Sequence, residues 1–107
     1  MQAISTTKDI IQNIGKIFEK GLQNEYLSRS IGKIIEYEKE KTIEEVNMLK
    51  KELSRFESAY QMSSKDFFER FEKGELGDKE DYFEWSAMYQ MYQRSADRLN
   101  IIESPSA

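Results

Sequence analysis

The fold of this chain is decided by residues 62–92, which read MSSKDFFERFEKGELGDKEDYFEWSAMYQMY. This stretch holds most of the aromatic residues of the chain and two successive helix-start signals. It also holds the whole excess of negative charge. Residues 63–84 carry eight acidic and four basic side chains, whereas acids and bases are equal in number in residues 1–62 and in residues 85–107. From its charge alone, an acidic surface of this kind is either a binding site for a partner of complementary charge or a solubilising turn, and the many aromatic residues favour binding.

The first helix-start signal is at Ser63. Its hydroxyl can cap a helix whose third residue is Asp66, and Met62 can pack on Phe67, as in a capping box with a hydrophobic staple. The apolar face of this short helix consists of three aromatic residues: Phe67, Phe68 and Phe71. We therefore expect a short, aromatic helix directly after Ser63.

A second helix follows two glycines, Gly74 and Gly77, either of which can supply the left-handed residue that ends a helix. Asp78 is expected to restart the helix, and the acidic residues after it suit the positive end of the helix dipole. Apolar residues then recur at spacings of three and four and form a wide face: Tyr82, Phe83, Trp85, Ala87, Tyr89, Met91, Tyr92, Ala96, Leu99 and Ile102. We expect four aromatic residues to be inside the fold: Phe67, Phe71, Trp85 and Tyr89.

Upstream, a long helix is expected from about Ser30 to Tyr60. Its heptad stripe has alternating spacings of four and three and consists of Thr42, Val46, Leu49, Leu53, Phe56 and Tyr60. A helix of this extent is about 45 Å long, which is more than one short helix can cover. Pairing along the stripe, within the chain or between chains, is therefore expected. The predicted seam of an oligomer consists of Val46, Leu49, Leu53, Phe56 and Tyr60.

The N-terminal segment predicts a weaker helix that begins near Thr6 or Thr7, with Asp9 placed to interact with its first turn. Gly15 and Gly21 destabilise this helix by about 1 kcal/mol each relative to alanine. The predicted fold class is all-α. A long helix packs as a helical hairpin with a C-terminal helix, a short aromatic helix lies at the corner, and the N-terminal helix is marginal. The expected boundaries are residues 1–29 for the N-terminal arm, 30–102 for the hairpin domain and 103–107 for a disordered tail.

The composition excludes most kinds of catalytic site. Cysteine and histidine are both absent, which removes zinc sites of the Cys/His kind, thiolate nucleophiles and histidine bases. The acids around the glycines do not have the alternating spacing of a calcium loop. We therefore expect no catalytic residue, no metal site and no cofactor.

The chain is expected to be cytoplasmic. Its first residues, MQAISTTKDII, lack the basic and apolar regions of a signal peptide, and no apolar run approaches a membrane span. Lys50, Lys51 and Arg55 form a small basic patch, but the net charge of -4 and the isoelectric point near 5.0 do not favour direct binding of nucleic acid.

Residues 62–85 resemble a group of small prokaryotic antitoxin-like proteins. Such proteins have a long charged helix, a short helix that starts with Met-Ser, a turn of the GELGD type and an acidic–aromatic helix that contains Glu-Trp. The matching positions are Met62, Ser63, Phe67, Phe71, Gly74, Glu75, Leu76, Gly77, Asp78, Asp81, Phe83, Glu84 and Trp85. The resemblance extends over about residues 37–99. It implies an antitoxin of a toxin–antitoxin operon that neutralises a toxin by direct contact, the toxin being commonly a ribonuclease or a nucleotidyltransferase-like enzyme.

The sequence therefore predicts two alternative functions. The first is a non-enzymatic antitoxin that binds a protein toxin through the outer face of its acidic–aromatic half. The residues expected to bind this partner are Glu75, Asp78, Glu80, Asp81, Tyr82 and Tyr92. The alternative is a self-associating coiled-coil scaffold or adaptor, a homo-oligomer that uses the seam described above.

Overall fold

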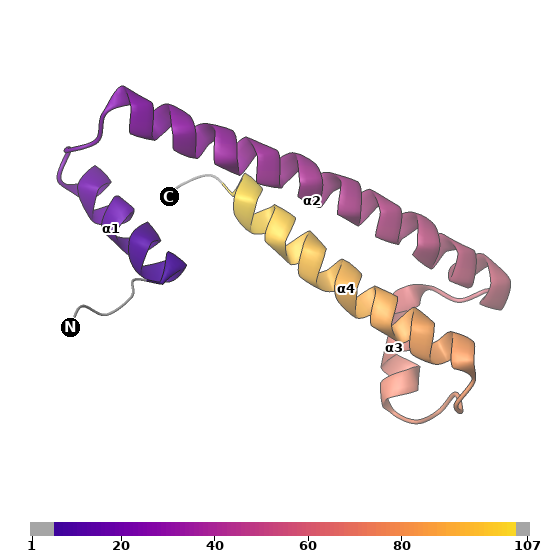
Figure 1. The fold of residues 1–107 in the computed structure, drawn as a ribbon. Coiled ribbons are helices and arrows are strands. Elements are labelled where there is room, and N and C mark those ends of the chain that lie inside the picture. The colour runs from indigo at the N-terminus through magenta and orange to yellow at the C-terminus, as the bar shows by residue number, and fades with distance from the viewer. Residues whose placement is uncertain (1–5, 105–107) are drawn as a thin grey trace. The chain divides into compact units, whose positions relative to one another are not determined.

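The computed structural model describes residues 6–104, which form four helices (Figure 1). They are α1 (Thr7–Glu19), α2 (Glu25–Tyr60), α3 (Ser64–Glu72) and α4 (Glu80–Glu103), and no strand occurs among these residues. The chain divides into two compact units, residues 1–34 and 35–107, and the division falls inside α2. The predicted disordered tail falls mainly on residues 105–107, outside the described part, while Glu103 belongs to α4.

In the C-terminal unit, α4 lies along α2 in the opposite chain direction, and α3 lies at the corner between them (Figure 1). The 24 residues of α4 extend about 36 Å. The part of α2 from Ile35 to Tyr60 extends about 39 Å, so the two helices are nearly equal in length. Ion pairs join the two helices near one end of the hairpin, between Arg98 and Glu38 at 2.5 Å and between Lys39 and Glu103 at 4.0 Å. The predicted all-α hairpin is confirmed.

One apolar residue from each helix of the C-terminal unit forms the centre of its core: Leu53, Phe67 and Trp85. The rings of Phe67 and Trp85 are both fully buried and stack with their centroids 3.9 Å apart. Stacked and edge-on ring pairs add about 0.5–1.5 kcal/mol beyond the burial of their area. Of the four aromatic residues expected inside, Phe71 and Tyr89 are only half-buried.

A short chain of hydrogen bonds holds the three helices in register at this core. The indole Nε1 of Trp85 donates to the Ser64 hydroxyl at 2.9 Å, and the Ser64 amide donates to the Glu57 carboxylate at 2.8 Å. The first bond satisfies a buried donor that would otherwise cost about 1–3 kcal/mol. The second supplies an acceptor to the N-terminus of α3, where backbone amides lack helical partners.

The heptad stripe of α2 is used inside the chain. Val46, Leu49 and Leu53 are buried, and Phe56 and Tyr60 are half-buried against the core around Trp85. Of the two forms of pairing that the stripe predicts, the structure contains the one within the chain. Three of the five residues predicted as an oligomer seam, Val46, Leu49 and Leu53, are therefore buried within the chain, while Phe56 and Tyr60 keep part of their surface exposed.

Both ends of α3 lie where the sequence predicts them, although only one of the two hydrogen bonds of the predicted capping box is present. The Ser63 hydroxyl accepts from the Asp66 amide at 3.1 Å, and Met62 is half-buried against the core that contains Phe67. At the other end Gly74 has φ +74°, its amide donates to the Phe71 carbonyl at 3.0 Å, and the Glu75 amide donates to the Arg70 carbonyl at 3.0 Å. This is the Schellman arrangement, in which a glycine in the left-handed region ends the helix.

The start of α4 differs from the prediction. The helix begins at Glu80 rather than at Asp78, and Lys79 stands at its N-cap without a side-chain hydrogen bond. Gly77, with φ +83°, turns the backbone just before this point. Capping residues alone therefore do not set this helix start, since contacts with α2 made by Asp81 and Tyr82 act there as well.

In the N-terminal unit, α1 has a complete capping box. The Thr6 hydroxyl accepts from the Asp9 amide, and the Asp9 carboxylate accepts from the Thr6 amide. None of the 13 residues of α1 is buried, and Ile10 and Ile11 are half or more exposed. A helix of this length is marginal in water without packing, which agrees with the weak helix expected here.

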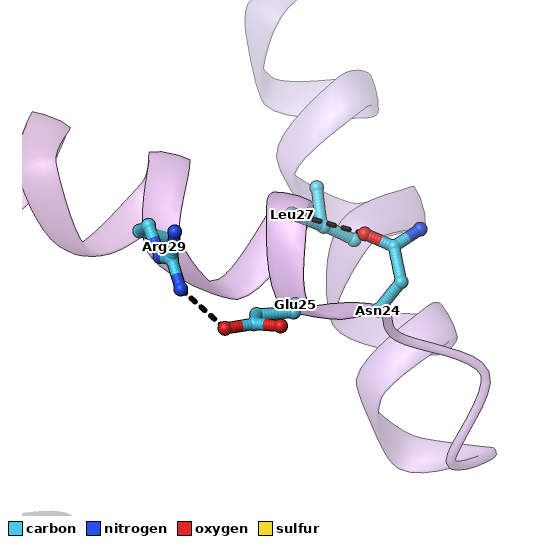
Figure 2. Close-up of polar contacts among 4 residues, drawn as sticks. All are labelled: Asn24, Glu25, Leu27 and Arg29. Carbon is cyan, nitrogen blue, oxygen red and sulfur yellow. Dashed lines mark hydrogen bonds and ion pairs between the residues drawn. The ribbon is translucent and has the colours of Figure 1, made fainter.

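The start of α2 lies earlier than the expected Ser30. The Asn24 side-chain oxygen accepts from the Leu27 amide at 2.8 Å and so caps a helix that begins at Glu25 (Figure 2). An ion pair between Glu25 and Arg29, one turn apart, supports this first turn (Figure 2).

Candidate functional site

The acidic residues predicted to bind a partner lie around the turn from α3 to α4. Glu75 and Asp78 are in the turn, Glu80 and Asp81 are in the first turn of α4, and all four are exposed. Glu75 forms an ion pair with Arg70, from Nε to Oε2, at 3.6 Å. Among residues 6–104, the ion pairs include none of the other three acids. The structure therefore brings these acids to one end of the hairpin with most of their charge uncompensated.

The two tyrosines predicted to bind the partner are half-buried. The ring of Tyr82 lies between the helices, with its centroid 5.4 Å from that of Tyr60 and 5.5 Å from that of Phe67. Tyr92 packs beside Tyr89 at 6.4 Å. Both tyrosines thus contribute to the core, and only part of each ring is available to a partner.

The most exposed aromatic ring of α4 is Phe83, which was expected on the apolar face. It is 57% exposed, and its edge-on contact with Phe71, at 5.4 Å between centroids, holds the ring in place. Ala87 and Met91 follow at intervals of four residues and are also exposed. Phe83 lies two residues from the buried Trp85, a spacing that places the two on different faces of a helix.

A groove of about 330 Å³ opens between the C-terminal part of α2 and the N-terminal part of α4. Its lining combines charged and aromatic side chains: Glu52, Arg55, Phe56, Ala59, Tyr60, Asp81 and Glu84. Phe56 and Tyr60 both stack on Trp85, with centroids 5.6 Å and 5.7 Å away, which fixes the aromatic part of the lining. The sequence predicted Asp81 as a binding residue and Phe56 and Tyr60 as seam residues, but it did not predict that they share one groove.

The Tyr60 hydroxyl donates to the Asp81 carboxylate across the two helices, with 2.6 Å between the oxygens. This hydrogen bond is the main reason that the pKa of Tyr60 is raised to about 12, and desolvation and the negative charge of Asp81 act in the same direction. Lys79 lies over the same aromatic group, with Nζ 5.5 Å from the Tyr60 centroid and 5.7 Å from that of Tyr82. Tyr60 is thus contacted both by the Asp81 carboxylate, at its hydroxyl, and by the Lys79 ammonium, at its ring.

The charges that line the groove are unbalanced. Glu52 is paired with Arg55 at 3.3 Å, while the ion pairs of residues 6–104 include neither Asp81 nor Glu84. The Lys79 ammonium lies over the Tyr60 ring without forming an ion pair within these residues, and the N-terminus of α4 contributes about half an elementary charge, so the three carboxylates of the lining still exceed the positive charge nearby. The lining of the groove therefore combines excess negative charge with the aromatic rings of Phe56 and Tyr60.

Comparison with known proteins adds nothing to this arrangement. Protein-family models, curated proteins and solved structures gave no match to the chain.

Within residues 6–104, acidic side chains do not gather in a group of three or more that could hold a metal ion. None of the four described helices is both long and apolar enough to cross a membrane.

Proposed function

We propose that this protein is a non-enzymatic cytoplasmic antitoxin that binds a partner toxin through the α3–α4 end of its hairpin. The observation that carries the proposal is the exposed Phe83 ring, which Phe71 holds in place and which follows the exposed acid Glu80 by three residues on the same side of α4. An immobilised aromatic ring costs little entropy when it enters a partner, and aromatic residues are frequent among the strongest contacts of interfaces. The resemblance of residues 62–85 to antitoxin-like proteins supports the choice of a toxin as the partner.

In this proposal the acids and the ring have different tasks. Glu75, Asp78, Glu80 and Asp81 guide a basic surface of the toxin, which raises the rate of association more than the affinity. Phe83 supplies the apolar contact together with the exposed part of Tyr82, whereas Tyr92, nine residues further along, lies on the opposite side of α4 and would have to be reached separately. The toxin in this proposal is a ribonuclease or a nucleotidyltransferase-like enzyme, because each carries a basic surface that binds nucleic acid or nucleotide phosphates.

The alternative of a self-associating scaffold has less support. The side chains of its predicted seam, from Val46 to Tyr60, are buried or half-buried within the chain. A second copy could reach Val46, Leu49 and Leu53 only after the hairpin opens, whereas Phe56 and Tyr60 are only half-buried.

The test is co-expression of this chain with the product of the neighbouring gene, followed by pull-down and by measurement of growth. We expect a complex and a rescue of growth by the wild-type chain. Phe83→Ala should weaken the complex by about 30-fold, the effect of losing a strong interface contact of about 2 kcal/mol. Met48→Ala is the matched control, because Met48 on α2 is also 57% exposed. The proposal fails if no complex forms, or if the two substitutions weaken the complex equally.

A further inference from the structure

We propose that the groove between α2 and α4 receives an arginine side chain of the partner protein. This inference rests on the proposed function for the identity of the partner, and on the groove itself for the chemistry of the contact. The lining of the groove commits it to a cation, because Asp81 and Glu84 carry charge that the described residues do not balance by ion pairs.

The aromatic part of the groove selects for arginine. Phe56 and Tyr60 line the groove and are held by their stacking on Trp85, so the site needs no rearrangement to present aromatic surface. A guanidinium is planar, stacks on aromatic rings and donates to carboxylates in a fixed fork, whereas an ammonium is a more strongly hydrated point charge. Stacking and forked donation together require rings beside carboxylates, and the groove has both.

The chain itself shows that this aromatic group accepts a cation. Lys79 places its ammonium within 6 Å of the centroids of both Tyr60 and Tyr82, which is the distance range of a cation–π contact. Lys79 is not among the residues that line the groove. Arg55 does line the groove but is already engaged by Glu52.

The order of the site along the helices suits a single inserted side chain. Phe56 and Tyr60 are four residues apart and lie on the same side of α2. Asp81 is fixed by the Tyr60 hydroxyl at 2.6 Å, and Glu84 lies one turn further along α4. The volume of about 330 Å³ is sufficient for one long side chain. The occupant is thus an anchor residue within a larger interface.

The direct test is a titration of the full-length chain, followed by amide and side-chain NMR signals, with the peptide acetyl-Gly-Arg-Gly-amide. We expect shifts at Ala59, Asp81 and Glu84, and none with the same peptide carrying citrulline, which has nearly the shape of arginine without its charge. Glu84→Gln should weaken binding of the arginine peptide by about 10-fold, the effect of losing one charge-assisted hydrogen bond. Glu45→Gln is the matched control, since Glu45 is an exposed helical glutamate outside the groove.

Three results would overturn the inference. Equal weakening by Glu84→Gln and Glu45→Gln would reduce the effect to net charge. Equal shifts with spermine would make the groove a site for any cation, and shifts absent from the groove would remove the site.

The pull-down distinguishes this inference from the antitoxin proposal. A toxin that binds the wild-type chain and Glu84→Gln equally contradicts the groove alone, whereas arginine binding in the groove without any toxin complex contradicts the antitoxin alone.

Discussion

At the scale of single residues, the pair of Tyr60 and Asp81 makes the stability of the fold depend on alkaline pH. The pKa of Tyr60 is raised from 10.0 in the unfolded chain to about 12 in the fold, chiefly because its hydroxyl donates to the Asp81 carboxylate. A group whose pKa is raised by folding contributes stability below its unfolded pKa and loses that contribution as the pH rises through its folded pKa. The contribution of Tyr60 is therefore complete below about pH 10 and is lost between about pH 10 and pH 12.

The measurement is urea unfolding at a series of alkaline pH values, for the wild type and for Tyr60→Phe. We expect the free energy of unfolding of the wild type to fall more steeply over this interval, because Tyr60→Phe has no proton to lose at this position. Asp81→Asn should lower the pKa of Tyr60 toward 10, as followed by the ultraviolet absorbance of the ionised phenol. Parallel curves for the wild type and Tyr60→Phe would show that the pair is not formed in solution.

At the scale of elements, Gly74 decides where α3 ends. Its φ of +74° lies in the left-handed region, and a side chain there would meet nothing within 4 Å, so the strain of the backbone alone sets the cost of substitution. Gly74→Ala should lower the free energy of unfolding by about 1–2 kcal/mol, which is the cost of the left-handed region for an ordinary residue.

The control at the same position is Gly74→Asn, since asparagine tolerates the left-handed region and should cost less than alanine. Lys73→Ala, at the preceding residue with ordinary helical φ, should change the stability by no more than about 0.5 kcal/mol. Urea unfolding of the three variants checks this order. A Gly74→Ala protein as stable as the wild type would show that the α3–α4 turn adopts another conformation.

Some helix ends could be predicted from the sequence and others could not. Local chemistry predicted both ends of α3, because Ser63 and Gly74 act on the few residues beside them. The start of α4 could not be predicted from Asp78 in the same way, since Asp81 and Tyr82 contact Tyr60 on another helix, 21 and 22 residues earlier in the chain. The start of α2 was predicted near Ser30 but lies at Glu25, where the Asn24 side chain caps the helix.

The candidate site was predicted only in part, for the same reason. The acids of the α3–α4 turn are local in the sequence, and the structure keeps them together and exposed. The groove joins Phe56 of α2 to Glu84 of α4, and this juxtaposition depends on the register of the hairpin. Heptad spacing shows which face of α2 is covered but not what covers it. Hence the same stripe predicted an oligomer seam and a hairpin equally well.

At the scale of the whole molecule, the buried side chains among residues 6–104 all lie between Thr42 and Ser95. A fragment of residues 35–107 should therefore fold by itself and unfold cooperatively in urea, within about 1 kcal/mol of the full chain, the cost of a missing helix cap at its new start. Its midpoint should not change with protein concentration, because the stripe of α2 is covered within the chain. Leu53→Ala in this fragment should cost about 2–5 kcal/mol, as expected for a buried leucine. An unfolded fragment would mean that residues 1–34 complete the core. A midpoint that rises with concentration would mean that a second copy completes it, and the scaffold function would then gain support over the antitoxin.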